Sequence, residues 1–187
     1  MVSSSYETDG FLVVRGALSS DECEKLDAFL TRFPLETRLD WGVRFAKNCI
    51  AKCPELGDLI TQSSVGKFSS SRFLYDEVVE TLNTATDPYP IHQDASYFPA
   101  ASVSLALALS PLQDARGGLC VAPGSHSSGL RPVEGRKVES TLENDQGGLE
   151  LLDLQRGDVV IIHPHLVHTM VRNSTALPAR MFSVILG

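Results

Sequence analysis

His92 and Asp94 stand two residues apart in the stretch PYPIHQDASYF, which is otherwise largely apolar. If this stretch is a β-strand, its side chains alternate between two faces, so His92 and Asp94 point the same way and Gln93 points opposite. Their Cα atoms then lie about 6.5 to 7 Å apart, close enough for both side chains to hold one ion. A His-x-Asp pair arises often by chance, so a metal site also needs a third ligand.

The candidates for a third ligand are few, because the chain has only five histidines. Three of them, His163, His165 and His168, lie within GDVVIIHPHLVHTMVRN, which begins as a strong strand. Two histidines and one carboxylate on a β scaffold form the facial triad of non-haem Fe(II) oxygenases, which leaves coordination positions open for a co-substrate and O₂. The residues alone leave open which of the three histidines completes it.

A triad with one carboxylate compensates little of the charge of Fe(II), so a chelating anionic co-substrate is favoured there. The far carboxylate of a chelating dicarboxylate would need a cation, and an arginine can bond both of its oxygens at once. Arg180 occupies a suitable place at the start of the last strand-like run, ALPARMFSVIL. The alternative interpretation of Arg180 is a surface arginine at the entrance of a strand.

The elements that must position these residues begin with a short strand, GFLVVRGAL, and a helix, SSDECEKLDAFLTRF. Ser19 and Glu22 have the spacing of a capping box at the start of that helix. Residues 40–70 indicate one or two short helices interrupted by Pro54 and Gly57.

From residue 72 onwards, strand-like runs alternate with Gly, Pro, Asn and Asp. The runs are RFLYDEVVETLN, YPIHQDASYF, ASVSLALALSPL, GGLCVAPGSH, GLELLDLQRGDVVIIH, HLVHTMVRN and RMFSVIL. This pattern favours a β-sandwich or barrel with helices packed outside it. The polar connection over residues 127–148 is either a plain solvated loop or a flap over the mouth of a site.

Length and composition limit the class of protein. A chain of 187 residues with 43% hydrophobic content can bury one core, which predicts a single domain over residues 1–187. The net charge of −7, with scattered basic residues, argues against nucleic acid or an anionic membrane as a partner. The N-terminus lacks the pattern of a signal peptide, so we expect a soluble cytoplasmic protein. Its four cysteines are then expected to be free thiols.

Four stretches of the chain resemble the phytanoyl-CoA dioxygenase family of Fe(II)- and 2-oxoglutarate-dependent oxygenases. They are YETDGFLVVRGALSSDECEKLDAF, IHQDASYF, GGLCVAPGSHSSG and GDVVIIHPHLVHTMVRNSTALPAR. Each motif is modest, but their order and spacing make the match specific. The resemblance implies a mainly β fold with flanking α-helices, built on a double-stranded β-helix, or cupin-like jelly-roll, core.

The resemblance also implies which side chains bind iron. His92, Asp94 and His168 match the family's ligands, and His168 aligns best because Asn173 follows it at the family's spacing. His163 is the fallback for the third ligand.

For the co-substrate, the resemblance assigns the far carboxylate of 2-oxoglutarate to Arg180. Two positions depart from the family's pattern. Met170 stands where the family has a small hydroxyl residue that helps to hold 2-oxoglutarate, and Thr169 lies beside it. On the strand before the His-x-Asp pair, Thr81 or Asn83 takes the place of the family's lysine or other polar residue.

The function implied by the resemblance is oxidation of a small organic substrate by O₂ and 2-oxoglutarate, with succinate and CO₂ as co-products, in secondary metabolism. Asp94 favours hydroxylation, because halogenating relatives replace this carboxylate with a small residue. Ring closure, desaturation and epoxidation stay open, since they start from the same hydrogen abstraction. Another alternative is a non-catalytic β-helix homologue that acts as a binding or partner subunit, and a homodimer is also open. Tyr97 and Phe98 are expected to be walls of the pocket.

Overall fold

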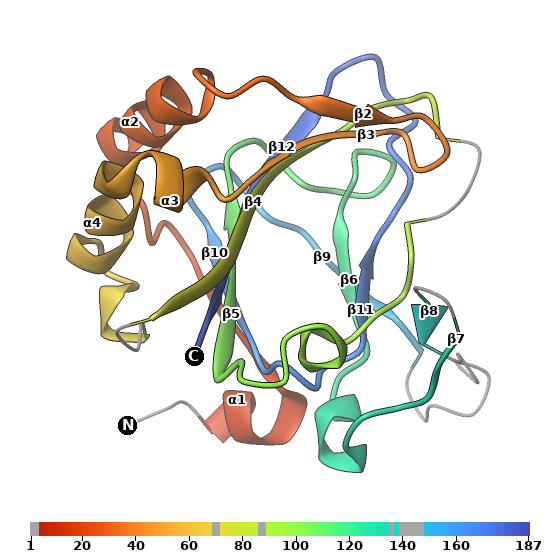
Figure 1. Ribbon diagram of the computed structural model, residues 1–187. Helices are drawn as coiled ribbons and strands as arrows, with labels where there is room; N and C mark the ends of the chain where they lie inside the picture. The colour runs from red at the N-terminus through yellow and green to blue at the C-terminus, as the bar shows by residue number, and fades with distance from the viewer. Residues whose placement is uncertain (1–3, 69–71, 86–88, 135–136, 139–147) are drawn as a thin grey trace.

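The computed structural model describes residues 4–68, 72–85, 89–134, 137–138 and 148–187. Two β-sheets face each other across the interior (Figure 1). The strands of the larger sheet are β1 (Phe11–Val14), β2 (Glu36–Arg38), β3 (Val43–Lys47), β4 (Phe73–Thr81), β5 (Val103–Ala108), β10 (Val159–Ile162) and β12 (Ala179–Leu186). They are antiparallel neighbours in the order β1-β10-β5-β12-β4-β3-β2.

The smaller sheet carries the distal histidine. Its strands are β6 (Leu119–Val121), β9 (Glu150–Leu152) and β11 (His168–Met170), in the order β11-β6-β9. His92 extends this sheet by one isolated antiparallel bridge to His168. A separate short hairpin pairs β7 (Val133–Glu134) with β8 (Lys137–Val138) inside the predicted connection 127–148. Residues 135–136 and 139–147 of that connection lie outside the described part of the chain.

Helices cover the outer face of the larger sheet, as Figure 1 shows for α2, α3 and α4. The helices of the described residues are α1 (Ser4–Asp9), α2 (Ser20–Leu30), α3 (Cys49–Lys52) and α4 (Pro54–Gln62), with 3₁₀ turns η1 (Gly66–Phe68), η2 (Asp94–Ser96) and η3 (Ser125–Ser128). The predicted capping box of α2 is confirmed, because Ser19 Oγ accepts from Glu22 N at 3.3 Å and Glu22 Oε2 accepts from Ser19 N at 2.8 Å.

Two local predictions need correction. Pro54 begins α4 as expected, but Gly57 does not interrupt that helix and lies buried inside it. A Cβ at Gly57 would come within 3.0 Å of the Phe73 ring, so the glycine allows α4 to pack closely on β4. The β2–β3 hairpin was not predicted at all, although Gly42 between its strands has a φ of +58°, which glycine adopts without strain.

The central strands β5 and β10 of the larger sheet are buried on both faces, so the sheet separates two apolar layers. Leu26 and Ile60 of the helices pack against Phe182 on the outer face. Val79 and Met181 face the smaller sheet on the inner face. Because successive side chains of a strand alternate, neighbouring residues of β12 belong to different layers.

The cysteine prediction is confirmed, because all four cysteines, Cys23, Cys49, Cys53 and Cys120, are free. Burial raises the pKa of the Cys49 thiol to about 11, and the nearby Asp76 carboxylate adds to this rise. Among the described residues, no helix is both long and apolar enough to cross a membrane.

Candidate metal centre and its cavity

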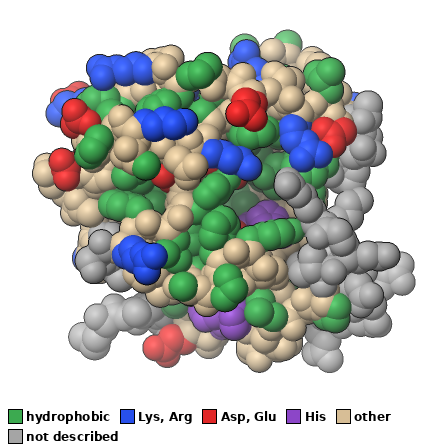
Figure 2. Space-filling model, in the orientation of Figure 1, with side chains coloured by type: hydrophobic (Ala, Val, Ile, Leu, Met, Phe, Trp, Pro, Cys, Tyr) green, Lys and Arg blue, Asp and Glu red, His purple; other side chains and the backbone are tan. Residues whose placement is uncertain are grey.

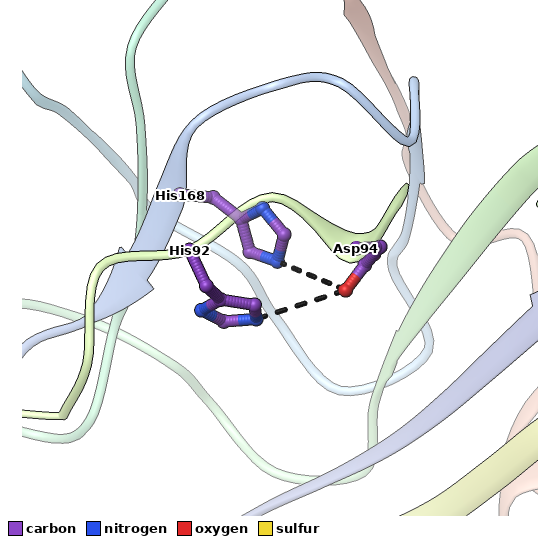
Figure 3. A group of neighbouring side chains, drawn as sticks. All are labelled: His92, Asp94 and His168. Carbon is purple, nitrogen blue, oxygen red and sulfur yellow. Dashed lines mark ion pairs between the residues drawn. The ribbon is translucent and has the colours of Figure 1, made fainter. Parts of the chain in front are cut away.

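His92, Asp94 and His168 converge at the edge of the smaller sheet (Figure 3). The Nε2 atoms of His92 and His168 lie 3.7 Å and 3.8 Å from the same oxygen, Oδ1 of Asp94. One ligand atom from each residue lies within 4.8 Å of the others. Two imidazole nitrogens and one carboxylate oxygen at this spacing can hold a single transition-metal ion.

Backbone hydrogen bonds orient both imidazoles. The two histidines exchange backbone N–H···O bonds of 3.0 Å, which set their side chains next to each other with ring centroids 4.2 Å apart. Nδ1 of His92 lies 2.9 Å from the Pro90 carbonyl, and Nδ1 of His168 lies 3.0 Å from the Leu166 carbonyl. Each carbonyl can only accept, so the proton belongs on Nδ1 and the Nε2 lone pair faces Asp94.

The electrostatics of the pair suit a metal ligand. Burial lowers the pKa of His92, and the neighbouring His168 lowers it further, while the Asp94 carboxylate opposes these effects. His92 is therefore neutral near pH 7, which is the state in which an imidazole binds a metal.

The chain around Asp94 is not the strand that the sequence predicted. After the single bridge at His92, the backbone turns into η2, which begins at Asp94 and is held by an Ala95 N–H···O bond to Pro164 at 2.9 Å. The turn, rather than strand alternation, brings the carboxylate over the histidines. Gln93 points away from them, as expected, and its amide is buried.

A cavity of about 590 Å³ opens in front of the triad. In Figure 2 it is a hollow walled by hydrophobic side chains, with histidine visible at its base and basic side chains near its rim. Aromatic rings from several elements contribute to its wall: Trp41, Phe45, Tyr75, Tyr89, Tyr97 and Phe98. The expected roles of Tyr97 and Phe98 as walls agree with this lining.

The larger sheet gives the cavity a polar strip that sequence analysis missed. Glu77 is aligned with Lys47 on one neighbouring strand and with Ser183 on the other, and all three line the cavity. The Tyr75 hydroxyl donates to Glu77 Oε2 at 2.7 Å, and burial raises the pKa of this carboxyl. Ser104 is also buried in the wall, and its Oγ has no hydrogen-bond partner among the described residues. The alternation of β4, with Tyr75 and Glu77 on one face, was the available signal.

Arg180 does not reach the cavity, which corrects the prediction that it binds the co-substrate. Its Nη1 lies 3.0 Å from Asp27 Oδ1 on α2, and its Nε lies 3.5 Å from Glu80 Oε1 on β4. Asp27 also pairs with Arg156 at 2.6 Å, and Glu80 with Arg44 at 2.5 Å. These five charged side chains form an ion network on the outer face of the sheet, and the inner face of β12 has Met181 and Ser183 instead.

The other predicted co-substrate residues also lie outside this cavity. Thr169 alternates with the inward His168 and donates its hydroxyl to the Tyr89 carbonyl at 2.8 Å. Thr81 is on the inner face, but its hydroxyl is covered by Gly117, where a Cβ would come within 2.2 Å of it. Asn83 is exposed in the turn after β4.

The remaining histidines form a separate group. The His163 ring lies 4.9 Å from that of His126 in a tilted arrangement and 5.3 Å from that of His165 edge to face, as measured between ring centroids. The His165 N–H donates to His163 Nδ1 at 3.1 Å. The fallback ligand His163 is therefore not part of the group that converges on Asp94.

Comparison with known families supports the same interpretation of the chain. The model of the phytanoyl-CoA dioxygenase (PhyH) family matches residues 56–181. The peroxisomal phytanoyl-CoA dioxygenase of Mus musculus is 24% identical over 91% of this chain and 62% of its own length. A probable phytanoyl-CoA dioxygenase of Caenorhabditis elegans is 31% identical over 48% of this chain and 33% of its own length. The chain thus spans less than two thirds of these relatives.

Solved structures share the architecture. The epimerase SnoN, in a complex with Fe3+, α-ketoglutarate and nogalamycin RO, superposes with a TM-score of 0.78 at 19% identity, over 97% of this chain and 80% of that one. HygX from Streptomyces hygroscopicus, with nickel and 2-oxoglutarate bound, gives 0.76 at 18% identity over 96% and 83%. EvdO2 from Micromonospora carbonacea gives 0.78 at 18% identity over 99% and 90%. The predicted double-stranded β-helix is confirmed by these likenesses.

Proposed function

We propose, from the premise that the chain belongs to the phytanoyl-CoA dioxygenase (PhyH) family, that it is an Fe(II)- and 2-oxoglutarate-dependent dioxygenase of a small organic substrate. The observation that carries this proposal is the convergence of His92 Nε2, Asp94 Oδ1 and His168 Nε2 at one side of a cavity. The bound iron would supply the activation of O₂ that amino-acid side chains cannot provide.

The donor set fits Fe(II) in three ways. Both imidazoles have their Nδ1 proton directed to a carbonyl, so each offers Nε2 as a ligand atom. Asp94 adds one anionic oxygen, and its presence favours hydroxylation over halogenation. The three ligand atoms lie within 4.8 Å of one another and line a cavity, so an ion held there would have room for a chelating 2-oxo acid and O₂.

The chain's own residues position the substrate and limit its contact with water. Tyr75 and Phe98 stack with ring centroids 4.8 Å apart, and Trp41 and Tyr89 meet edge to face at 5.6 Å. Such rings can align an organic substrate beside the ion while keeping the site apolar. The hydroxyl and carboxyl of Tyr75 and Glu77 offer it hydrogen bonds on the opposite wall.

We also propose that the substrate is a small molecule of secondary metabolism. HygX has been solved with hygromycin B, and SnoN with nogalamycin RO, both of which are organic small molecules. A cytoplasmic location belongs to the same proposal and is supported by the four free thiols. Whether the oxidation ends in hydroxylation, ring closure, desaturation or epoxidation depends on the substrate.

A second candidate is a non-catalytic homologue that keeps the fold as a binding or partner subunit. The position of Arg180 favours it, because the guanidinium pairs with Asp27 and Glu80 and does not reach the cavity. The intact triad argues for the enzyme.

Succinate formation separates the two candidates. The iron-loaded protein is supplied with 2-oxoglutarate, O₂ and a panel of small organic substrates, and succinate is measured. The enzyme should release succinate with the wild type, should lose it with Asp94→Ala, and should keep it with His165→Ala. A protein that binds Fe(II) but makes no succinate with any member of the panel would support the non-catalytic candidate.

A further inference from the structure

Two adjacent residues of β12 determine whether the cavity wall presents a positive charge to a co-substrate. Arg180 lies on the outer face, where its guanidinium is shared between Asp27 and Glu80. Met181 lies on the inner face and lines the cavity. Turning Arg180 inward would require β12 to slip by one residue, which would break its register with β4 and β5 and bring Met181 outside.

The wall beside His168 is apolar. Met170, two residues further along β11, is 6% exposed and belongs to the same buried cluster as Met181, Val79 and Leu119. Val43 completes this wall from β3 and is 2% exposed. A carboxylate placed against these side chains would lose its water without gaining a charged or hydrogen-bonding partner.

Two cations line the cavity among its described residues, and both lie where it meets solvent. Arg38 is bonded to Asp40 at 2.8 Å, and its guanidinium lies 3.7 Å above the ring centroid of Trp41. Lys47 is exposed, and its ammonium lies 5.0 Å from the ring centroid of Phe45. Neither belongs to the apolar wall beside His168.

We propose that this cavity binds its 2-oxo acid by chelation and by contact with the apolar wall beside His168, and that Lys47, Ser104 and Ser183 on the larger sheet give no advantage to a second carboxylate. The inference rests on the proposed function and adds the chemical class of co-substrate that the site prefers, a 2-oxo monoacid with an apolar tail. Such a tail gains free energy against Met170 and Met181, whereas the far carboxylate of 2-oxoglutarate must stay in water or be desolvated without compensation. The site then binds 2-oxoglutarate but does not prefer it to a 2-oxo monoacid.

The test compares two co-substrates that differ at one end. Fe(II)-loaded protein is titrated without O₂ with 2-oxoglutarate and with 2-oxovalerate, which has the same chain length but a methyl end. Binding is followed by calorimetry and by the visible charge-transfer absorption of the iron chelate. We expect 2-oxovalerate to bind at least as tightly as 2-oxoglutarate. A preference of about tenfold or more for 2-oxoglutarate would overturn the proposal.

Variants at the two adjacent residues give a matched comparison. Arg180→Gln removes the outer cation and should leave the ratio of the two affinities unchanged. Met181→Arg adds a guanidinium to the inner face and should raise the affinity for 2-oxoglutarate by about tenfold relative to 2-oxovalerate. If the Met181 variant does not fold, the wild-type ratio and the Arg180 variant still decide the matter, because a selective loss of 2-oxoglutarate binding in Arg180→Gln would refute the inference.

Lys47→Met tests the other possible anchor. We expect its ratio of affinities to equal that of the wild type, and a selective loss of 2-oxoglutarate binding would place the far carboxylate at the rim and overturn the proposal. Failure of the proposed function looks different. In that case Fe(II) binds, but neither 2-oxo acid changes its absorption or releases heat.

Discussion

Arg180 and Met181 are adjacent on β12, yet one joins an ion network with α2 and the other lines the cavity in front of the triad. Because side chains of a strand alternate between its two faces, these two neighbours lie on opposite faces of the sheet. An arginine that the sequence offers for binding is used to attach a helix to the sheet. The binding side of the same strand is left without a cation.

The first prediction concerns this attachment. Arg180→Gln should lower the free energy of unfolding by about 1 to 3 kcal/mol, because Asp27 and Glu80 lose a partner in a half-buried setting. Metal affinity should not change, since Arg180 lies on the other face of the sheet. Urea unfolding and metal calorimetry measure the two quantities. Arg32→Gln, an exposed arginine after α2, is the control and should have little effect on either. Weaker metal binding in Arg180→Gln would contradict the assigned structural role.

The second prediction tests the ligands. His92→Ala, Asp94→Ala and His168→Ala should each weaken Ni²⁺ or Fe²⁺ binding by about 100-fold or more, because each removes one of the converging ligand atoms. His165→Ala should bind the ion as the wild type does, because its ring belongs to the separate group around His163. Calorimetry without O₂ measures the affinities. The reverse pattern, with His165 essential and His168 dispensable, would show that the ligand assignment is wrong.

The third prediction concerns the residue between two ligands. Gln93 is fully buried, and its side chain bonds the carbonyls of Gly129 and His165 and accepts from Arg131 N at 2.8 Å. Gln93→Met keeps the length of the side chain but leaves these backbone groups unpaired, which should cost about 2 to 4 kcal/mol of unfolding free energy.

Urea unfolding of Gln93→Met and of Gln62→Met, an exposed glutamine at the end of α4, gives the comparison. Equal losses in the two variants would mean that the buried hydrogen bonds of Gln93 contribute nothing specific.

The fourth prediction is a pH dependence. Burial alone would raise the pKa of Asp158, but bonds from Gln155 N, Gly16 N and Arg15 outweigh it and lower the pKa. The folded-state pKa is thus below the unfolded value of about 3.9. The stabilisation by this carboxylate is therefore present above that value and is lost as the pH falls through the folded-state pKa.

Asp158→Asn should accordingly be less stable than the wild type near pH 7, and its stability should fall less steeply below about pH 5. Urea unfolding at a series of pH values measures both effects. Asp58→Asn, at an exposed position on α4, should follow the wild type. Parallel curves for Asp158→Asn and the wild type would exclude this carboxylate as a source of acid sensitivity.

The sequence alone predicted those elements that are specified by residues close together in the chain. The bonds between Ser19 and Glu22 follow from a four-residue motif, and β4 follows from a strand-like run that contains aromatic and β-branched residues. The side of β12 that faces the cavity could not be predicted, because both of its faces are buried and apolar residues occupy both. Because of that ambiguity, the sequence did not reveal that Arg180 lies on the outer face, away from the cavity.

The triad was found for a partly wrong reason. The predicted strand through His92 and Asp94 is one bridge followed by η2, so the carboxylate reaches the histidines through a turn that pattern analysis does not encode. The β2–β3 hairpin, which brings Trp41 and Lys47 to the cavity, was missed because its strands are short and partly exposed.

The bridge between His92 and His168 joins two distant segments by a single pair of backbone bonds. An ion held by these side chains and Asp94 would act as a cross-link, closing a long loop that the backbone alone closes weakly. Free ion at about 100 times its Kd should add about 2.7 kcal/mol of stability, and a chelator should lower the Tm accordingly. The stability of the folded protein would then depend on the concentration of the free ion as well as on its own packing.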